Sequence, residues 1–343
     1  MLKRINLFRC LVASNMRRLS SPYKATFAMT YRCNLRCHIC RIWEQPPAAE
    51  LSLGDIAQIF KNFKNLAWLD LTGGEVTLRE DVVDVIRVIA QNAPKLILFH
   101  ISTNGQRPEK ALLMARAVLS AGLVPVINVS VDGPAAINDT LRGVKGAFAK
   151  SMETFKQLKA ENPRGHYYLS CTLSNQNLLY VEEMLADIKK VVPAFTHADI
   201  HFNLCHTSAH YYKNSTVGAD RGMDARLVMK YMSLSKNGSW MKVLLENQYL
   251  KKMALFLSGN RFPITCQALN ATCFIDPCGR VYPCGIFDEP VGLLRDFDND
   301  MGRLWRQGVV MKGRERIEQH KCPGCWSPCE AYPAILGGVR CWR

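Results

Sequence analysis

The sequence has no long hydrophobic run, and residues 1–24 contain no acidic side chain. Its apolar runs are strand-length, whereas a helix needs about 20 apolar residues to cross a bilayer. The basic start also lacks the continuous apolar stretch and the small-residue cleavage site of a secretory signal. These absences argue against a membrane-spanning or secreted protein and predict a cytoplasmic one, with membrane association left open.

The acid-free N-terminal stretch carries a helical pattern of apolar residues. These residues recur at a spacing that places them on one helix face: Leu2, Ile5, Phe8, Val12 and Met16. The pattern predicts a basic amphipathic helix over residues 1–23. Such a helix either contacts a membrane surface or a partner, or packs on its own domain, and the sequence fits both.

Cysteine, by contrast, is abundant. The 14 cysteines fall mainly into three clusters, near residue 35, between 266 and 284, and between 322 and 341. In a reducing compartment, clustered cysteines bind metal more often than they form disulfides. The net charge of +15 also favours an anionic partner. An acidic electron-donor protein, an anionic substrate, a membrane surface and nucleic acid all fit that charge.

Strand-like and helix-like segments alternate through the first 200 residues. Strands are predicted at 26–30, 67–71, 95–102, 124–131, 167–173 and 199–204, and helices at 55–63, 82–91, 111–121, 148–160 and 180–191. This alternation predicts a parallel sheet with covered faces, which places functional groups at the carboxyl ends of its strands. An irregular stretch over 205–221, a helical bridge over 224–261 and a cysteine-rich unit over 262–343 follow.

The first cysteine cluster comes directly after the first predicted strand. Cys33, Cys37 and Cys40 have C-x3-C-x2-C spacing, which gathers three thiolates in one short loop. Three cysteines can bind three corners of a four-iron, four-sulfur cluster and leave the fourth iron open for a small molecule. Tetrahedral zinc, with His38 as a fourth ligand, is the alternative.

This loop resembles the signature of the radical S-adenosylmethionine (SAM) superfamily, although Ile39 stands where that family usually has an aromatic residue. The resemblance covers residues 24–205 and implies a partial (βα)6 TIM-like barrel in an α/β fold, over residues 24–223. It further implies a [4Fe–4S] cluster whose open iron binds SAM, and a reduced flavodoxin- or ferredoxin-type electron donor. One electron from the cluster then breaks the sulfonium, and the resulting 5′-deoxyadenosyl radical abstracts hydrogen from a substrate.

Polar motifs follow the next three strands. The second strand leads into Gly73, Gly74 and Glu75, which the resemblance assigns to the methionine amino group of SAM. After later strands, the resemblance implies contacts to the ribose and to the methionine carboxylate. The residues that would make them are Ser102, Asn104, Ser130, Asp132 and Arg142. Turn formation and, for Arg142, a plain surface position are the alternatives. Asn175 and Asn177 are weaker candidates.

The C-terminal cysteines resemble the auxiliary-cluster extensions known as SPASM and twitch domains. Cys266, Gly279 and Cys284 match the C-x9-15-G-x4-C opening, and Cys273 and Cys278 are further ligand options. The closing half departs from the full two-cluster pattern, and its candidates are Cys322, Cys325, Cys329 and Cys341. We therefore expect one or two auxiliary [4Fe–4S] clusters, with a zinc knuckle as the alternative.

The leading functional hypothesis is a radical SAM enzyme that abstracts hydrogen from a peptide, a small molecule or a lipid-like substrate. Only about 24 residues precede the first strand, which disfavours an N-terminal peptide-binding domain. The alternative is a zinc-binding or iron–sulfur protein without SAM chemistry, acting as a nucleic-acid binder or a scaffold. Nucleic acid is disfavoured because aromatics do not interleave the basic residues. The sequence does not identify catalytic residues, and it offers His206, Tyr211 and Tyr212 as candidates for mutation.

Overall fold

The computed structural model describes residues 2–163, 165–215, 223–235, 240–259 and 262–338. Its centre is one curved sheet whose strands run in the order β6-β5-β4-β3-β2-β1-β7-β8-β9. The six parallel strands predicted from the sequence are all present, each paired with its sequence neighbour: β1 (Lys24–Ala28), β2 (Trp68–Thr72), β3 (Leu98–Thr103), β4 (Val124–Ser130), β5 (His166–Leu173) and β6 (Ile200–Leu204). The predicted α/β partial barrel is therefore confirmed.

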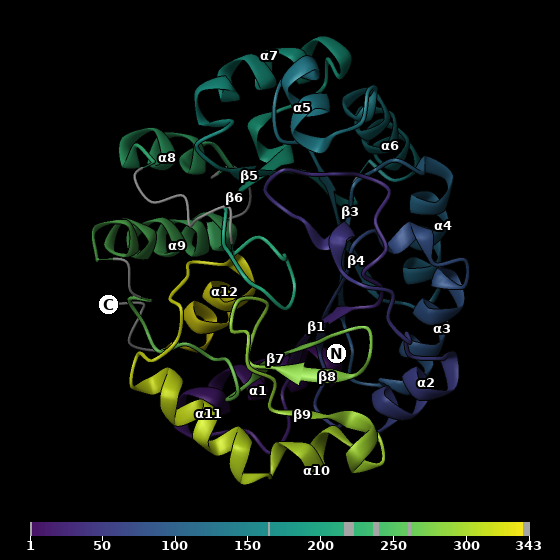
Figure 1. Ribbon diagram of the computed structural model, residues 1–343, viewed down its shortest axis with the longest axis vertical. Coiled ribbons are helices and arrows are strands. Elements are labelled where there is room, and N and C mark those ends of the chain that lie inside the picture. Colours follow the sequence, from purple (N-terminus) through teal and green to yellow (C-terminus); the bar gives the residue numbers. More distant parts are fainter. Residues whose placement is uncertain (1, 164, 216–222, 236–239, 260–261, 339–343) are drawn as a thin grey trace.

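Five helices cover the outer face of this sheet, as Figure 1 shows: α2 (Leu53–Lys61), α3 (Val82–Asn92), α4 (Pro108–Ser120), α6 (Ala147–Glu161) and α7 (Val181–Val191). Each follows a strand, as a parallel sheet requires. The sequence reading missed α5 (Ala135–Arg142), a short helix between β4 and α6. Short 3-10 helices supplement these elements: η1 (Ile42–Glu44), η2 (Val76–Leu78), η3 (Leu178–Tyr180), η4 (His197–Asp199), η5 (Ser233–Ser235) and η6 (Leu294–Phe297).

The strands place apolar side chains under the helices and polar side chains inside the barrel. In β3, for example, Phe99 and Ile101 are fully buried, while His100 and Ser102 alternate with them. The same alternation continues in β4, β5 and β6. Because side chains of a strand point alternately to its two faces, polar residues such as His100 lie on the inner face of the barrel, beside apolar ones.

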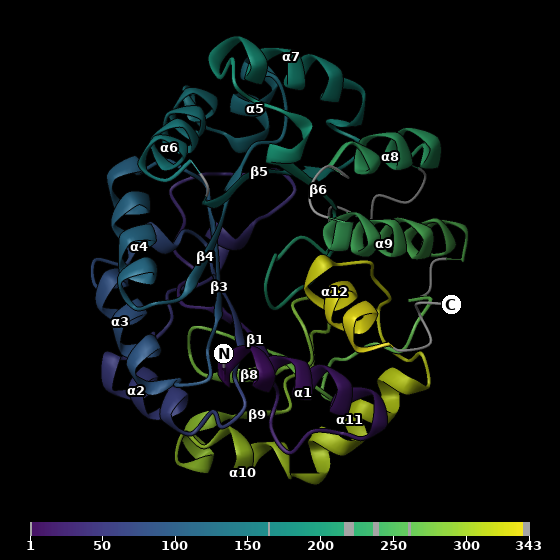
Figure 2. The same cartoon turned by 180° about the vertical axis from the view of Figure 1, so that it is seen from behind.

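The cysteine-rich unit continues the same sheet. β7 (Thr272–Ile275) pairs in parallel with β1, and β8 (Arg280–Tyr282) and β9 (Gly292–Leu293) add antiparallel strands. Two helices follow, α10 (Met301–Trp305) and α11 (Gly308–Glu318). Figures 1 and 2 show α8 (Ala225–Met232), α9 (Trp240–Gly259) and α12 (Pro328–Gly337) filling the space between the β6 edge and the C-terminal strands. The barrel is thus closed by helices on its open side.

Two predicted segments are described in part. The irregular stretch contains no helix or strand over residues 205–215, and residues 216–221 lie outside the described part of the chain. The N-terminal prediction corresponds to α1 (Leu2–Met16), which packs through Leu7, Cys10 and Leu11 onto Tyr23 and Ala271. No helix in the described ranges is long and apolar enough to cross a membrane.

Candidate functional site

The cysteine loop lies over the carboxyl edge of the barrel because it leaves the end of β1 directly. Its backbone is held by the last turn of α5: the N–H of Arg36 donates to the Arg142 carbonyl at 2.9 Å, and the N–H of His38 donates to the Leu141 carbonyl at 2.9 Å. A second anchor comes from the β2 end, where the Gly74 N–H donates to the Thr30 carbonyl at 2.8 Å. The loop is therefore fixed by helix α5 and by the end of β2.

The environment of its three thiols suits metal ligation. Burial raises the pKa of Cys33 to about 11, and burial likewise raises the pKa values of Cys37 and Cys40. The Arg142 guanidinium acts in the opposite direction on Cys33 and Cys37. Besides burial, Cys37 raises the pKa of Cys33, and both Cys37 and Cys33 raise the pKa of Cys40, as expected for thiols of one short loop. Without a cation these cysteines stay protonated, and bound iron would supply the positive charge that thiolates need.

The paired glycines allow two backbone segments to touch. A side chain at Gly74 would meet the Arg32 carbonyl oxygen at 2.2 Å and the Tyr31 carbonyl oxygen at 2.6 Å. Gly73 has a φ of +149°, and a Cβ there would lie 2.4 Å from the Thr30 oxygen. Only glycine permits this approach, so the Gly-Gly pair allows the end of β2 to pack directly against the cysteine loop.

Glu75 connects the ends of β2 and β3. It is fully buried, and its carboxylate accepts hydrogen bonds from Thr77, from the Thr103 hydroxyl at 2.7 Å and from the Asn104 N–H at 2.6 Å. Asn104 in turn donates to Asn34 Oδ1 at 2.8 Å, and its Nδ2 lies 3.9 Å from Cys33 Sγ. Glu75 therefore orients Asn104 toward the cysteine loop.

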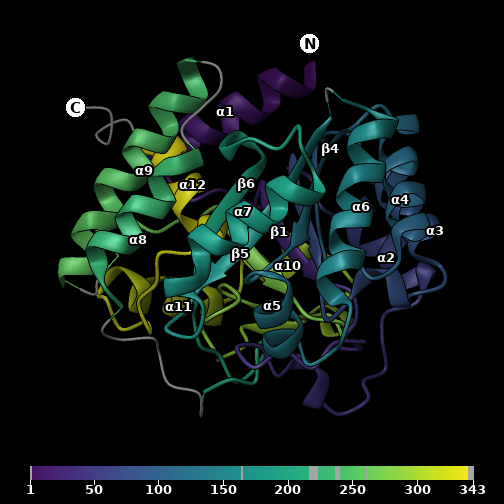
Figure 3. The ribbon, with the colours of Figure 1, turned by 90° about the horizontal axis from the view of Figure 1, so that it is seen from above.

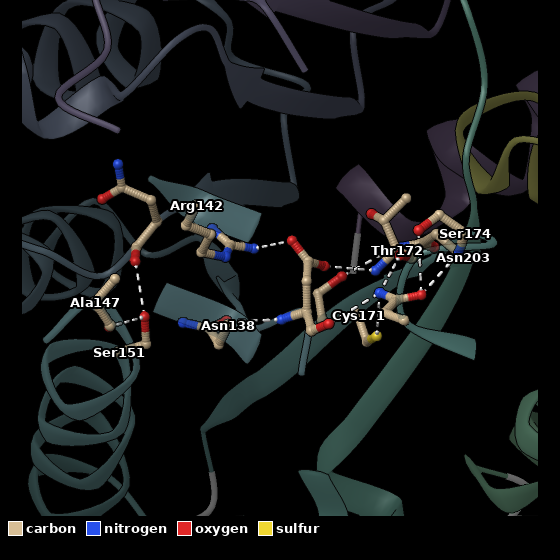
Figure 4. Close-up of polar contacts among 12 residues, drawn as sticks. Asn138, Arg142, Ala147, Ser151, Cys171, Thr172, Ser174 and Asn203 are labelled. Atoms are coloured by element: carbon tan, nitrogen blue, oxygen red, sulfur yellow. Dashed lines mark hydrogen bonds and ion pairs between the residues drawn. The ribbon is translucent and has the colours of Figure 1, made fainter. Parts of the chain in front are cut away.

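Asp132 and Arg142 form a buried ion pair, and Figure 4 shows Arg142 with the groups around it. Arg142 Nη2 donates to Asp132 Oδ2 at 2.6 Å. The backbone N–H of Thr172 donates to Asp132 Oδ1 at 3.0 Å, and the Asp132 N–H donates to Asn138 Oδ1 at 2.9 Å. Arg142 Nε is buried with no hydrogen-bond partner among the described residues. One donor of the guanidinium thus stays available for an anionic ligand beside Cys37.

The other polar candidates differ in their surroundings. Ser102 and Ser130 are half-buried on the inner face at the carboxyl ends of β3 and β4. Asn177 is committed to the framework, because its Nδ2 donates to the Asp132 carbonyl at 3.0 Å and to the Thr172 carbonyl at 2.9 Å. The structure thus brings the cysteine loop, the Gly-Gly-Glu turn, Asn104 and the Asp132–Arg142 pair to one edge of the sheet.

The 205–215 segment covers this edge with aromatic side chains. The Tyr211 hydroxyl lies 2.8 Å from Thr72 Oγ1 and donates to the Gly73 carbonyl at 3.2 Å. Tyr211 and Tyr212 also pack in an apolar cluster with Cys33 and Cys40. Burial lowers the pKa of His206 to about 4, so its ring is neutral at pH 7. Burial and the two other cysteines of the loop raise the pKa of Cys40, and Cys205 raises it further. A fourth thiol therefore lies near the loop.

Among the C-terminal cysteines, four share one site. Burial is the main cause of the raised pKa values of Cys266, Cys284 and Cys325. A further cause is the charge of neighbouring thiols: Cys284 acts on Cys266, Cys325 on Cys284, and both Cys266 and Cys322 on Cys325. Cys322 and Cys266 also line one hollow with Arg314 and His320. The described region holds no group of three His, Cys, Asp or Glu side chains around a single-ion position. A cubane cluster differs, since it spreads its ligands over separate irons.

The remaining predicted cysteine ligands lie elsewhere. Cys273 is within β7, in register with Ala25 of β1, and Cys278 is in the turn between β7 and β8 beside Asp276. Cys329 begins α12 and lines the barrel interior. Cys341 lies outside the described residues.

The barrel interior contains a cavity of about 180 Å³ below the carboxyl edge. Strands β2, β3, β4 and β6 and helices α8, α9 and α12 contribute to it, and its polar lining includes His100, Asn128, His201, Asn203, Glu246 and Cys329. Asn128 Oδ1 is buried and has no hydrogen-bond partner in the described part of the chain. At the cavity wall, Lys24 Nζ lies 2.6 Å from Asp70 Oδ2, and His100 Nδ1 lies 3.3 Å from Asp70 Oδ1.

Sequence reasoning missed these interior residues. The signal was present, because polar residues alternate with apolar ones in four of the strands, at Asp70 in β2, His100 in β3, Asn128 in β4 and Asn203 in β6. In a sheet whose outer face is covered by helices, such alternation marks the side chains that point inward.

Comparison with known proteins gives concordant results. The family model described as the radical SAM superfamily matches residues 27–188. The AdoMet-dependent heme synthase of Oleidesulfovibrio alaskensis is 25% identical over 333 residues, which cover 91% of this chain and 81% of that protein. The mycofactocin maturase MftC of Mycobacterium ulcerans is 25% identical over 93% of this chain and 83% of its own length.

Two solved structures resemble the fold. Streptococcus suis SuiB bound to S-adenosylmethionine has a TM-score of 0.60 at 16% identity, over 86% of this chain and 68% of that chain. The enzyme anSMEcpe with bound AdoMet has a TM-score of 0.56 at 17% identity, over 85% and 82% of the two chains. At such low identity these matches speak to the fold alone.

Proposed function

This chain is a member of the radical SAM superfamily, and from that premise we propose that it cleaves SAM reductively and uses the product to abstract hydrogen from a substrate held in the barrel. When bound, the [4Fe–4S] cluster and SAM supply a 5′-deoxyadenosyl radical, because one added electron breaks the C5′–sulfur bond and methionine leaves. Membership in this enzyme superfamily gives no support to a nucleic-acid binder or a scaffold without SAM chemistry.

The observation that carries the proposal is the meeting of the cysteine loop with the β2 and β4 ends. Cys33, Cys37 and Cys40 would hold three irons of the cluster. Arg142, whose Nε is buried and unpaired within the described ranges, would bind the methionine carboxylate. Asp132 would orient that guanidinium through their ion pair. The backbone of Gly73 and Gly74 would approach the methionine amino group without steric hindrance.

Glu75 has a different role in this proposal. Its carboxylate is already occupied by donors from Thr77, Thr103 and Asn104, so it acts as a positioning residue rather than a SAM ligand. Asn104 then stands beside Cys33. Ser102 and Ser130, on the inner face of the sheet, are the remaining candidates for the ribose hydroxyls.

The substrate site is the interior cavity. It lies inside the barrel below the strand ends and is lined mainly by apolar side chains, with a few polar groups such as Asn128 and His201. Asn128 Oδ1 is a buried acceptor that a donor of the substrate would satisfy. We therefore infer a largely apolar substrate moiety with at least one hydrogen-bond donor. The relatives' names cover heme synthesis and mycofactocin maturation, so they point to no single substrate.

We further propose one auxiliary [4Fe–4S] cluster rather than two. Its ligands would be Cys266, Cys284 and Cys325, whose raised pKa values have burial as the main cause and one another's charge as a further one, together with Cys322, which acts on Cys325 and lines one hollow with Cys266. Cysteine-only ligation fits iron–sulfur chemistry. Cys273, Cys278 and Cys329 would remain thiols.

The electron donor would dock on the cysteine-loop side. Arg32 and Arg36 are exposed within that loop, close to the three thiols. A reduced flavodoxin- or ferredoxin-type protein is acidic, so these cations would attract it to the face nearest the cluster.

The decisive test is SAM cleavage by the anaerobically reconstituted holoenzyme. With dithionite and SAM, we expect 5′-deoxyadenosine and about eight irons per chain, on four irons for each cluster. Cys37→Ala is expected to abolish the product and to keep about four irons. Cys10→Ala, which changes a thiol on the packing face of α1, is the matched control and should behave like the wild type. A fully loaded enzyme that forms no 5′-deoxyadenosine would refute the proposal.

A further inference from the structure

Helix α1 has two apolar faces, and only one of them is used for packing. Leu7, Cys10 and Leu11 face the domain and contact Tyr23 and Ala271. The opposite face exposes four apolar side chains with exposed fractions of 44%, 66%, 38% and 82%: Ile5, Phe8, Val12 and Met16. These four define the outer stripe. Their spacing of three to four residues makes the stripe continuous along the helix.

The sequence pattern at the N-terminus therefore describes the outer stripe and not the packing face. An amphipathic helix that merely packs on its own domain turns its apolar stripe inward. Here the apolar residues at regular spacing are the ones left in water, and a second set holds the helix in place. A contiguous exposed apolar surface of this kind marks a site of interaction.

In the N-terminal segment that forms the outer stripe, every charged side chain is basic. Arg4 and Arg9 are exposed on α1 beside the stripe, Arg17 is exposed directly after the helix, and the first acidic residue of the chain is Glu44. Burial raises the pKa of Cys10, and Lys95 together with Arg9 partly offsets this effect, so Lys95 adds another cation near the helix. At the Met16 end, α11 brings the acids Glu315 and Glu318 to a hollow that Met16 and Arg17 also line.

We propose that the outer stripe of α1 docks on an anionic lipid membrane surface. Apolar side chains flanked by arginines are the composition of helices that lie in the membrane interface, with their apolar face in the acyl boundary and their cations among lipid phosphates. Nucleic acid would use the arginines but gives no reason for four exposed apolar side chains. A lipid surface accounts for both features.

The position of α1 suits this role. The helix sits at the amino ends of the strands, since Tyr23 directly precedes β1 and Ala271 directly precedes β7. Figure 3 shows α1 at one extreme of the molecule. The cysteine loop leaves the opposite, carboxyl edge. Docking would therefore leave the proposed SAM and electron-donor sites facing the aqueous side.

The same end of the barrel holds part of the interior cavity. Trp68 and Leu98, the first residues of β2 and β3, line it. The docked enzyme would thus turn the amino-terminal side of the cavity toward the bilayer.

The test is co-sedimentation of the reconstituted holoenzyme with lipid vesicles. Vesicles of phosphatidylcholine mixed with phosphatidylglycerol should bind the enzyme at least tenfold more tightly than pure phosphatidylcholine, and high salt should weaken this binding. Phe8→Ser with Met16→Ser should release the enzyme from the mixed vesicles. Arg4→Glu with Arg9→Glu should lower the affinity by well over tenfold, since each basic residue contributes roughly fivefold.

The matched control changes the same residue types at the carboxyl side of the barrel. Leu179→Ser with Lys150→Glu removes an exposed leucine and an exposed cation there, and vesicle binding should stay unchanged. All variants should keep the wild-type iron content and 5′-deoxyadenosine formation, which separates this test from that of the proposed chemistry.

Several outcomes would overturn the membrane proposal. Equal binding to neutral and anionic vesicles, or full binding by the outer-stripe variants, would remove its basis. So would an RNA oligonucleotide that competes fully with the vesicles. A stripe-dependent dimer in sedimentation analysis, without vesicle binding, would assign the outer stripe to a second copy of the chain instead.

Discussion

Arg142 Nη2 and Asp132 Oδ2 are 2.6 Å apart, and each side chain is only 6% exposed. This pair joins the segment after β4 to the last residue of α5. The carbonyl oxygens of Arg142 and Leu141 accept hydrogen bonds from the cysteine loop. The ion pair therefore supports the loop through α5, besides lying next to Cys37.

Removing the Asp132 carboxylate should destabilise the folded protein. We predict that Asp132→Asn lowers the free energy of unfolding by about 3–5 kcal/mol, because it leaves the Arg142 guanidinium buried without its counter-charge. Denaturant titration under anaerobic conditions measures this change. The matched control is Glu161→Gln, which breaks an ion pair with Arg116 on the surface and should change stability little. A loss no larger than that of the control would contradict the supporting role of the pair.

The auxiliary ligands can be separated by iron counting. We expect Cys325→Ala to reduce the iron content from about eight to about four per chain, since one ligand of the auxiliary cluster is lost. Cys329→Ala, four residues later at the start of α12, should retain about eight. Electron paramagnetic resonance of the reduced proteins gives an independent count of clusters. If both variants lost the same amount of iron, Cys329 would belong to the ligand set.

Gly74 tests the close contact between the β2 end and the cysteine loop. Gly74→Ala should destabilise the protein by about 1–3 kcal/mol and lower the occupancy of the radical-type cluster, because the new methyl group overlaps the Arg32 and Tyr31 carbonyl oxygens. Thermal unfolding and iron content are the two measurements. At Gly308, a Cβ would meet no atom within 4 Å, so Gly308→Ala is the matched control and should be tolerated.

The buried Lys24–Asp70 pair offers a test of the barrel interior. Asp70→Asn should cost about 3–5 kcal/mol of stability, because Lys24 is left as an unpaired charge. Lys24→Met in the same chain should recover most of this loss. Chemical unfolding of the single and double variants checks the prediction, and a double variant as unstable as Asp70→Asn would contradict it.

The pH dependence of this pair follows from its pKa shifts. Burial alone would raise the pKa of Asp70, but Lys24 and His100 outweigh it and hold the pKa below its ordinary value. For Lys24, burial opposes protonation, yet Asp70 keeps its pKa above the ordinary value. The Asp70 contribution is lost only as the pH falls through its lowered pKa, and the Lys24 contribution only as the pH rises through its raised pKa. The cost of Asp70→Asn should therefore be constant between about pH 5 and pH 9.

Much of the fold could be predicted because its signals are local. The run from Val124 to Ser130 reads as a strand from its own residues, and helix α6 needs only its own 3.6-residue period. The short helix α5 was missed because its sequence contains turn-forming Asn and Asp, and its stability depends on Asp139 accepting from the N–H groups of Gly146 and Phe148. Such contacts join residues that a local pattern does not connect.

In the candidate site, too, local features could be predicted from the sequence, whereas contacts between distant residues could not. The sequence by itself determined that three cysteines share a loop after the first strand, because C-x3-C-x2-C spacing confines them whatever the rest of the chain does. It also determined that polar motifs follow successive strands. Only the tertiary structure decided which C-terminal cysteines meet, since Cys266 and Cys325 are separated by most of the cysteine-rich unit.

The structure likewise decided that β7 extends the sheet at β1 and that the outer stripe of α1 faces water. Both outcomes depend on long-range packing, in which residues distant along the chain compete for the same buried surface. A residue pattern specifies that a helix or strand has an apolar face, but the partner that covers this face is set by the whole fold.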